Sequence, residues 1–347
     1  MKLGLGAAAF GAKLKIDIDH IRHAESLGFD SCWTAEAYGN DAVTTATWVA
    51  AHTTKMKVGT SIMQMPARTP AMTAMTANSL DALSGGRFIL GLGPSGPQVA
   101  EGWHGVPYGK PLTRTKEYIE ILRKIFAREA PLEHHGEHYD IPVTGEGTTN
   151  LGKPLKSILH GNPDMKIYTA SISPAGLRCA GEVADGVFPM MMNPTTYDTV
   201  IGPYLEEGFA KAGGGKSLAD FDVCPSATVI ISDDVEQARM PVKMGLALYI
   251  GGMGARGKNF YNDYAKRLGY EEAAVKIQDL YLDGKKGEAV AAVPDELVDD
   301  VHLVGPADRI RERLGAWKEA GKNRHVDTMI VGTSQREALE LCAEELL

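Results

Sequence analysis

Glycines and hydroxyl side chains follow directly after short apolar runs at two places in this sequence. Gly93 and Ser95 follow the run RFILGL, and the segment SISPAG at 171–176 follows KIYTA. Glycine has no Cβ, so its backbone can approach a flat or anionic ligand closely. At the start of a helix, free N–H groups and the helix dipole favour an anion. We therefore expect both segments to line a ligand site.

The segment SISPAG has the residue types of an anion-binding turn. The hydroxyls of Ser171 and Ser173 and the N–H groups of Ala175 and Gly176 would surround an anion at the first turn of a helix. A second interpretation is that Ser173 only caps this helix, with Pro174 at its first position. One residue can serve both purposes, so both interpretations stay open.

The elements that position these loops alternate between strand and helix. The fixed rhythm of short apolar strands and helical patterns is typical of parallel βα units. We expect strands from Lys2, Phe29, Lys57 and Arg87 and over 166–170, 185–188, 223–231 and 327–331, with helices over 18–27, 42–52 and 70–83. Eight strands favour a (β/α)8 TIM barrel over an open Rossmann sheet.

Two long segments interrupt this rhythm. The first, 131–163, contains a predicted hairpin, LEHHGEHYDIP, and the second, 233–306, separates the seventh and eighth strands. Long insertions on a barrel usually shape the mouth of the active site or an oligomer contact. We therefore expect one α/β barrel domain over 1–347, with insertions after strands 4 and 7.

Composition excludes several classes of protein. The chain has 347 residues, a formal net charge of −8 and no Lys/Arg run, which disfavours nucleic-acid and anionic-membrane partners. No apolar stretch is long enough to span a bilayer and no signal peptide is evident, so a cytoplasmic location is expected. The four cysteines are far apart and are expected to be buried and reduced. Trp33, Trp48 and Trp317 are expected in the core.

The predicted hairpin carries acidic and histidine side chains between Glu133 and His138 that resemble a metal site. Side chains alternate between the two faces of a strand, so this spacing scatters them. Zinc requires a defined tetrahedral set of ligands. We therefore predict no metal site.

Motifs spread over most of the chain resemble the luciferase-like flavin and deazaflavin oxidoreductases, closest to the actinobacterial branch that uses coenzyme F420. The motifs are GFDSCWTAEAYGNDA at 28–42, KVGTSI at 57–62, LDALSGGRFILGLGPSGPQVAEGWHG at 80–105, AGEVADGVFP at 180–189 and ALYIGGMG at 247–254. The resemblance implies a redox enzyme with a tricyclic cofactor in a barrel mouth. That cofactor would exchange a hydride with a small-molecule substrate.

The resemblance also implies how the cofactor is held. Thr60, Ser61 and Ile62 would lie against its ring, and the Ser61–Ile62 peptide would be cis. The turn at 171–176 would bind its phosphate, and Arg178 would meet its anionic tail. Arg178 has a simpler interpretation as a solvated surface charge.

The proton donor is where this chain departs from its relatives. Many deazaflavin relatives carry an acid–histidine pair after the second strand, but the matching residues here are Glu36 and Ala37. Adding a hydride to a carbonyl, imine or alkene still requires a proton. Glu36 is the first candidate, because burial favours the neutral form of a carboxyl, although it could instead be a salt-bridged loop residue. Tyr38 and His104 are further candidates.

Three functions remain open on the sequence alone. The first is an F420-dependent oxidoreductase acting on an apolar carbonyl, imine or alkene. The second is an FMN-dependent monooxygenase of the same superfamily. The third, suggested by the missing histidine at Ala37, is a catalytically silent deazaflavin-binding protein. A homodimer or higher homo-oligomer is expected in each case.

Overall fold

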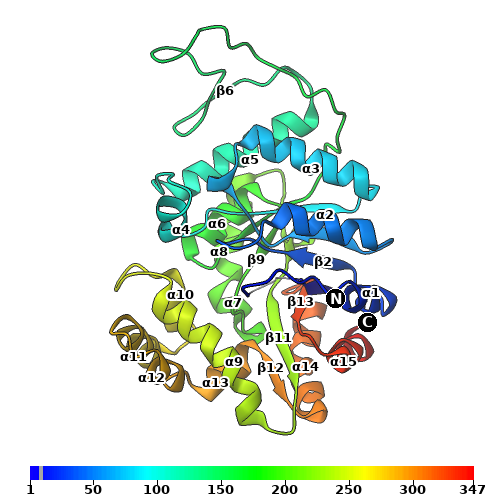
Figure 1. Cartoon of the computed structure of the whole chain (residues 1–347), viewed down its shortest axis with the longest axis vertical. Coiled ribbons are helices and arrows are strands. Elements are labelled where there is room, and N and C mark those ends of the chain that lie inside the picture. The colour runs from blue at the N-terminus through cyan, green and yellow to red at the C-terminus, as the bar shows by residue number, and fades with distance from the viewer. Residues whose placement is uncertain (8–10) are drawn as a thin grey trace.

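A curled sheet of parallel strands organises the part of the chain that the computed structural model describes, residues 1–7 and 11–347 (Figure 1). Its strands are β1 Lys2–Gly6, β2 Ser31–Thr34, β3 Lys57–Thr60, β4 Met63–Gln64, β5 Phe88–Gly93, β8 Ile167–Ala170, β9 Gly186–Phe188, β10 Asp222–Val223, β11 Ser226–Ile231, β12 Leu303–Gly305 and β13 Thr328–Gly332. A separate hairpin pairs β6 His134–His135 with β7 Asp140–Ile141.

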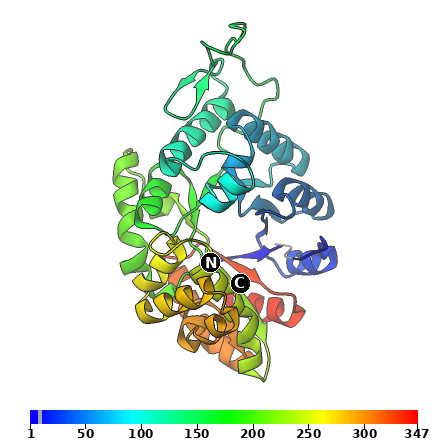
Figure 2. The same cartoon turned by 60° about the vertical axis from the view of Figure 1, so that its left-hand side comes forward.

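Helices surround this sheet (Figure 2). The α-helices are α1 Ile18–Ser26, α2 Ala42–His52, α3 Pro70–Ser84, α4 Pro97–Gly102, α5 Pro111–Ala127, α6 Pro174–Val183, α7 Tyr197–Val200, α8 Gly202–Ala212, α9 Val235–Ala247, α10 Phe260–Arg267, α11 Glu271–Leu282, α12 Lys286–Ala291, α13 Asp295–Val301, α14 Ala307–Lys322 and α15 Arg336–Leu346. Short 3-10 turns lie at η1 Met65–Ala67, η2 Pro194–Thr196 and η3 Leu218–Asp220, and η4 Leu248–Gly252 is a π-helical turn.

The strand order is β10-β9-β8-β5-β3-β2-β1-β13-β11-β12, with β4 paired to β5. The segment 222–231 bonds to two strands that lie far apart in this order. Cys224 N–H donates to Val187 O of β9 at 2.8 Å, and Ile330 N–H of β13 donates to Pro225 O at 2.8 Å. The sheet therefore curls until one segment touches both β9 and β13.

Local signals account for the boundaries of the elements. Helix α3 begins with Thr69, whose hydroxyl accepts from Met72 N–H, and with Pro70 at its first position. It ends at Gly85, whose φ of 72° is left-handed and favours glycine. The strands and helices expected from the sequence are confirmed within a few residues, and so is the hairpin. Strand β12 was not expected, because it lies within the segment interpreted as an insertion.

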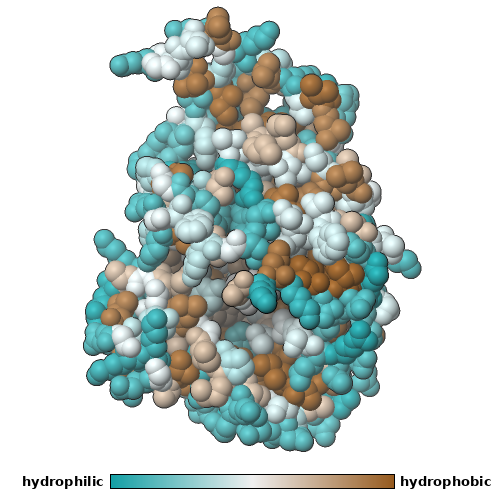
Figure 3. Space-filling view, in the orientation of Figure 1, coloured by the Kyte–Doolittle hydropathy of each residue, from teal (hydrophilic) through white to brown (hydrophobic). Residues whose placement is uncertain are grey.

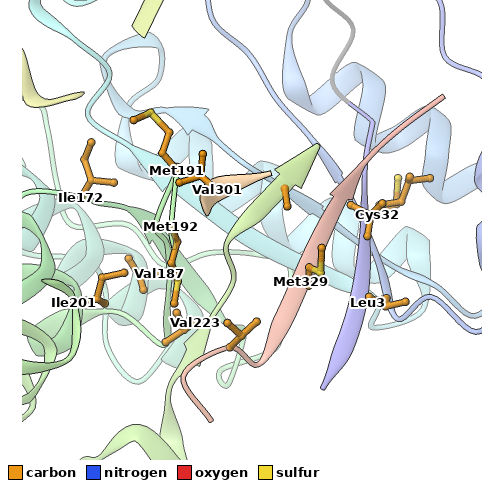
Figure 4. Close-up of a cluster of buried hydrophobic side chains, with 14 of the residues drawn as sticks. Leu3, Cys32, Ile172, Val187, Met191, Met192, Ile201, Val223, Val301 and Met329 are labelled. Carbon is orange, nitrogen blue, oxygen red and sulfur yellow. The ribbon is translucent and has the colours of Figure 1, made fainter. Parts of the chain in front are cut away.

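Two buried layers hold the fold together. The inside of the curled sheet is filled by Trp33, Ile89, Tyr168, Phe188, Cys224 and Ile330. The layer between strands and helices is aliphatic; Figure 4 shows Val187, Met192 and Ile201 together at one side and Leu3, Cys32 and Met329 at the other. All four cysteines are buried, as expected.

One expectation about the core is wrong. Trp33 and Trp317 are buried, but Trp48 is 53% exposed. Helix α2 is AVTTATWVAAH, which carries no charge before His52, so the sequence does not reveal which face meets the solvent. Trp48 lies on the outer face.

The hairpin is fixed to the molecule by a buried carboxylate. Glu117 of α5 accepts backbone N–H bonds from Glu137 at 2.9 Å, His138 at 2.9 Å and Tyr139 at 3.1 Å. Burial alone would raise the pKa of Glu117, but these bonds outweigh burial and lower it. The hairpin segment therefore projects beyond α3 and α5 from a defined base (Figure 1).

A histidine between α13 and β12 makes stability depend on pH. Nδ1 of His302 accepts from Thr228 N–H at 2.9 Å, and burial lowers its pKa from 6.5 to about 4. Below pH 6.5 the unfolded chain binds a proton that the folded chain does not. Its stabilising contribution is therefore complete above pH 6.5 and is lost as the pH falls towards 4.

We expect this loss to reach at most about 3 kcal/mol in the free energy of unfolding. His302→Asn keeps an acceptor close to Nδ1 but removes the titration. Urea unfolding at pH 7 and 4.5 should therefore show a smaller fall in stability for His302→Asn than for the wild type. Equal falls in both proteins would contradict the assignment.

Candidate functional site

Adjacent parallel strands bring the predicted ligand loops to one edge of the sheet. Strands β3, β5 and β8 are neighbours and run parallel. The segments that follow them, 61–62, 94–96 and 171–173, therefore lie on the same side. Ile62 and Ala170 are partly buried and pack on the apolar cluster inside the sheet. They form an apolar floor beneath these loops.

The end of β3 and the end of β5 form one wall of this site. The Ser61–Ile62 peptide is cis, as the resemblance implied. Ser61 N–H donates to Thr34 O at 2.6 Å. The Ile62 side chain lies so close to Gly93 that a Cβ added there would come within 2.8 Å of Ile62 Cδ1. Ile62 and Gly93 therefore meet as a close-packed apolar surface.

Thr60 supports this wall from within. It is fully buried, and its hydroxyl donates to Gly91 O at 2.8 Å and accepts from Gly91 N–H at 3.0 Å. These two bonds tie β3 to β5. The contact of Thr60 with a cofactor stays a prediction, since its side chain is occupied by Gly91.

Ser95 shapes the glycine-rich loop after β5. Its φ of 60° is left-handed, which is uncommon for a residue with a side chain. Its carbonyl accepts from the hydroxyl of Tyr108 at 3.3 Å. The segment after α4 therefore folds back onto this loop.

The turn at 171–176 caps helix α6, as one of the two interpretations requires. Ser173 Oγ accepts from Gly176 N–H at 3.1 Å. A Cβ added to Gly176 would lie 2.9 Å from Ser173 Oγ and 3.2 Å from Ser171 Oγ. The two hydroxyls therefore converge on a cradle beside Gly176. The Ala175 N–H belongs to the same first turn, where helix N–H groups have no intrahelical acceptor.

Arg267 of α10 reaches the same turn and was missed by the sequence analysis. Its guanidinium donates to Ile172 O at 2.5 Å and lies 5.2 Å from the centre of the Tyr264 ring. Among the described residues, its buried Nε has no hydrogen-bond partner. No local pattern could have identified it, because 95 residues separate it from Ile172.

Arg178, expected to contact an anionic tail, is paired within the protein. Its guanidinium forms an ion pair with Glu207 of α8 and lies 4.9 Å from the centre of the Tyr204 ring. Arg178 would have to leave Glu207 to meet a ligand, so this contact stays a prediction.

Glu36, in the loop after β2, accepts hydrogen bonds from several groups of the protein. Its carboxylate accepts from Gln64 N–H at 2.7 Å and from Ala42 N–H at 2.9 Å. The guanidinium of Arg68 binds both of its oxygens, at 2.5 and 3.0 Å. The carboxylate is therefore fully used in holding three segments together. Its role as proton donor stays a prediction, and its geometry is that of a salt-bridged loop residue.

The ion pair acts on Arg68 as well. Burial alone would lower the pKa of Arg68, but the hydrogen bond and the charge of Glu36 outweigh burial and raise it. The side chains of Arg68 and Glu36 are only 18% and 6% exposed. The buried ion pair therefore holds the loop after β2 against the segment that follows β3.

His104 is linked to the backbone at Ala37, the position at which the resemblance implies a histidine. Its Nε2 lies 2.6 Å from Gln64 Oε1, and Gln64 Nε2 donates to Ala37 O at 2.9 Å. One buried glutamine therefore links His104, from the β5 loop, to Ala37, from the β2 loop. Gln64 was not singled out by the sequence analysis, because nothing in KVGTSIMQ indicates a partner 40 residues away.

Tyr38 is the most open of the three predicted proton donors. It is 58% exposed and lies near Tyr249 of η4. Burial raises the pKa of Tyr249, and the phenol of Tyr38 adds to this rise. The ring of Tyr249 packs 4.8 Å from that of Tyr261, centre to centre. Aromatic side chains from the β2 loop and from the η4–α10 segment therefore lie together.

Neither a metal-binding group nor a membrane-spanning helix is found within residues 1–7 and 11–347. No group of three or more His, Cys, Asp or Glu side chains is arranged to bind a metal ion. Within the same residues, none of the helices combines the length and apolarity needed to cross a bilayer.

Comparison with known proteins identifies the class of this fold and site. The family model described as luciferase-like monooxygenase matches residues 5–324, and the chain belongs to that family. A Mycobacterium tuberculosis protein, provisionally named as a coenzyme F420-dependent oxidoreductase, is 44% identical over 330 residues, covering 94% of this chain and 95% of its own length.

Two solved structures share the fold. The coenzyme F420-dependent tetrahydromethanopterin reductase of Methanopyrus kandleri matches with a TM-score of 0.77 and 26% identity, over 100% of this chain and 99% of that chain. An F420-dependent secondary alcohol dehydrogenase, solved as a complex with an F420–acetone adduct, matches with a TM-score of 0.74 at 18% identity over 99% and 97% of the two chains. At that identity the second likeness bears on the fold alone.

Proposed function

We propose that this protein is a coenzyme F420-dependent oxidoreductase that transfers a hydride between the deazaflavin and an apolar carbonyl, imine or alkene. The main support is the 44% identity over 94% of the chain to a relative named for this coenzyme. The fold of the tetrahydromethanopterin reductase, which its own name describes as coenzyme F420-dependent, adds to this support.

The residues at the site suit such a coenzyme. Ile62, Gly93 and Ala170 offer an apolar surface to a flat ring. A phosphate at the 171–176 turn would meet the hydroxyls of Ser171 and Ser173. Arg267 would add charge there, because its guanidinium contacts Ile172 O and, among the described residues, its Nε has no hydrogen-bond partner. The bound deazaflavin would supply the hydride chemistry. The chain itself would orient the substrate and provide the proton.

We further propose that the curled sheet is a single (β/α)8 barrel domain over 1–347. The hydrogen bonds of segment 222–231 to both β9 and β13 support closure. The segments 131–163 and 233–306 would then be insertions after the fourth and seventh strands. Both lie outside the regular alternation of strand and helix.

His104 is the proton donor that the geometry supports best. Glu36 is held by Arg68 and two backbone N–H groups. His104 is partly buried, and within residues 1–7 and 11–347 its side chain has one side-chain partner, Gln64. A histidine from the β5 loop would then replace the one that relatives carry at the position of Ala37. Tyr38 remains a second candidate because it is exposed at the β2 loop.

Equilibrium dialysis of the purified protein against F420 and, separately, FMN tests the choice of cofactor. We expect binding of F420 and little binding of FMN. Reduced F420 should then be oxidised in the presence of one or more members of a panel of apolar ketones, imines and enones. Tight FMN binding without F420 binding would instead favour a monooxygenase, which the family description keeps as the alternative.

A catalytically silent deazaflavin-binding protein is a third outcome of this experiment. It would bind F420 but leave the reduced coenzyme unchanged across the panel. The proximity of His104 to the backbone at Ala37, through Gln64, argues against it, because a proton carrier is present near the expected place.

Gly176→Ala tests the phosphate cradle. The new Cβ would lie 2.9 Å from Ser173 Oγ and fill the space between the two hydroxyls. We expect at least about tenfold weaker F420 binding, because the serine hydroxyls must shift away from the new Cβ; the gain in helix propensity offsets part of the cost of that shift in stability. Gly102→Ala is the matched control: it lies in α4 with no atom within 4 Å of its added Cβ. Unchanged affinity in Gly176→Ala would exclude the cradle as the phosphate site.

We also propose that two copies of the chain associate through the outer faces of α2 and α3. Two adjoining grooves lie on this face, and none of the described residues that line them is ionisable. They are lined by Leu14, Ile16, Val43, Thr44, Thr45, Thr47, Trp48, Ala51, Met72, Met75, Thr76, Ser79, Leu80 and Leu83. Figure 3 shows apolar side chains gathered beside α2, over the segment that leads into α1.

A second copy of the chain is the partner that suits the outer faces of α2 and α3, because of their lack of charge and their exposed apolar area. The chain carries a net charge of −8, and an uncharged face lets two copies meet without repulsion. Leu14, Trp48, Met72, Met75 and Leu83 are each more than half exposed. Together they offer on the order of 500 Å² of apolar surface, against about 800 Å² per partner in a standard interface.

Trp48→Glu should therefore yield a monomer. It removes an aromatic anchor and places two like charges at a symmetric interface. Analytical ultracentrifugation should give the mass of a dimer or larger assembly for the wild type and of a monomer for the variant. Ala210→Glu, on the exposed face of α8, is the control and should keep the wild-type mass. A monomeric wild type would refute this surface as a self-association site.

A further inference from the structure

The orientation of the buried Gln64 side chain follows from its partners. Its Nε2 lies 2.9 Å from Ala37 O and 3.3 Å from Glu36 O. Carbonyl oxygens only accept hydrogen bonds, so the amide nitrogen must face them. The amide oxygen is then directed at His104 and can only accept. Gln64 is 3% exposed, so solvent does not compete for these bonds.

This orientation fixes the protonation of His104. Its Nε2 lies 2.6 Å from Gln64 Oε1 and must carry a hydrogen to make that bond. The neutral imidazole is therefore the Nε2–H tautomer, with its lone pair on Nδ1. Among the residues described here, Nδ1 of His104 has no hydrogen-bond partner. The proton that His104 gains or loses is consequently the one on Nδ1.

Glu36 takes part in this arrangement through the backbone. It accepts from Gln64 N–H at 2.7 Å and is held in turn by Arg68. The carboxylate and the histidine that relatives place next to each other are here separated by Gln64. The charged groups behind Gln64 are thus Glu36 and Arg68, together with Asp41, which lies 3.3 Å from the guanidinium of Arg68.

We propose that Gln64 is a positioning residue that holds His104 in the Nε2–H tautomer, so that Nδ1 exchanges the proton with the substrate. This role rests on the proposed reductase function. Reduction of a carbonyl requires a hydride on carbon, which the reduced deazaflavin supplies as it is oxidised, and a proton on oxygen. The Nδ1–H bond of the imidazolium breaks, an O–H bond forms on the substrate, and His104 becomes the neutral tautomer. A proton from the solvent then restores the imidazolium, which balances the proton that the coenzyme would release to the solvent on its oxidation.

Nitrogen NMR of the coenzyme-free protein tests the tautomer without any turnover. In protein labelled with ¹⁵N at histidine, with the signals of His104 assigned by their loss in His104→Ala, we expect only Nδ1 to change its shift on titration. Nε2 should stay protonated, with slow exchange of its hydrogen. Gln64→Met removes the acceptor and should give averaged shifts for the two nitrogens of the neutral ring and fast exchange.

Two further variants separate positioning from general damage. Gln64→Glu, protonated at the oxygen that faces Ala37 O, keeps both the donor to that carbonyl and the acceptor towards Nε2, and should retain the Nε2–H tautomer. Gln278→Met changes another buried glutamine, 6% exposed and bonded to Ala255 O, and should leave the His104 signals as in the wild type. Urea unfolding identifies any variant that fails to fold.

Activity provides the second measurement. With a substrate from the panel, Gln64→Met should lower kcat at least about tenfold with little change in KM, and Gln64→Glu should restore part of it. A neutral wild-type His104 with its hydrogen on Nδ1, or identical spectra for wild type and Gln64→Met, would overturn the positioning role. Because the spectra need no coenzyme, failure of this role is distinguishable from failure of the proposed function.

Discussion

Replacing Gly91 with alanine is expected to destabilise the protein more than any other single change considered for the site. A Cβ at Gly91 would come within 1.7 Å of Thr60 O and 2.8 Å of Phe188 Cε2. Thr60 O belongs to the backbone, so no side-chain rotation relieves the first clash. The strands β3 and β5 would have to separate, which breaks the two hydrogen bonds between Thr60 and Gly91.

We expect a loss of about 3 kcal/mol or more in the free energy of unfolding, or failure to fold. Urea unfolding followed by circular dichroism gives the value. Gly102→Ala, which meets no atom within 4 Å, should stay within about 0.5 kcal/mol of the wild type. Wild-type stability in Gly91→Ala would mean that β3 and β5 do not approach each other as described.

The second large effect is expected for Glu36→Gln. The amide cannot accept from Arg68, Ala42 and Gln64 as the carboxylate does, and its own N–H₂ group must face donors. Arg68 would keep only the weaker contact to Asp41 at 3.3 Å. Removing one partner of a buried ion pair leaves the other charge uncompensated, so we expect a loss of about 3 kcal/mol in stability.

The double variant Glu36→Gln with Arg68→Met separates this structural role from catalysis. If Glu36 mainly compensates Arg68, the double variant should regain part of the stability that Glu36→Gln loses. If Glu36 were the proton donor, Glu36→Gln would abolish turnover while stability and F420 binding stayed at the wild-type level. Unfolding curves and equilibrium dialysis on the same preparations distinguish these outcomes.

The parts of the fold that depend on neighbouring residues could be predicted from the sequence. Thr69 and Pro70 begin α3 and Gly85 ends it, and each is a local signal. The turn at 171–176 was found for the same reason, since its serines and its proline lie within six positions of each other. Because the strands are parallel, the loops that follow them lie at one edge of the sheet.

The partners within the site could not be predicted, because they are distant in the sequence. Gln64 meets His104 across 40 positions, Arg68 meets Glu36 across 32, and Arg267 meets Ile172 across 95. Local patterns carry no information on such pairs. The sequence therefore left Glu36 open between a proton donor and a salt-bridged loop residue, and the structure surrounds it with donors.

Trp48 illustrates a different failure. Helix α2 is apolar or neutral on every face up to His52, so hydrophobic periodicity cannot separate a core face from an uncharged surface. The sequence favoured burial in the core. The structure exposes Trp48 on a face that a second copy is proposed to cover.

The central claim is that this site holds coenzyme F420 with its ring at the ends of β3 and β5. A crystal structure of the protein soaked with the coenzyme tests it most directly. We predict the ring against Ile62 and Gly93, a phosphate at the 171–176 turn, and His104 on the side of the ring that receives the substrate. Coenzyme bound elsewhere, or a phosphate remote from Ser171 and Ser173, would contradict it.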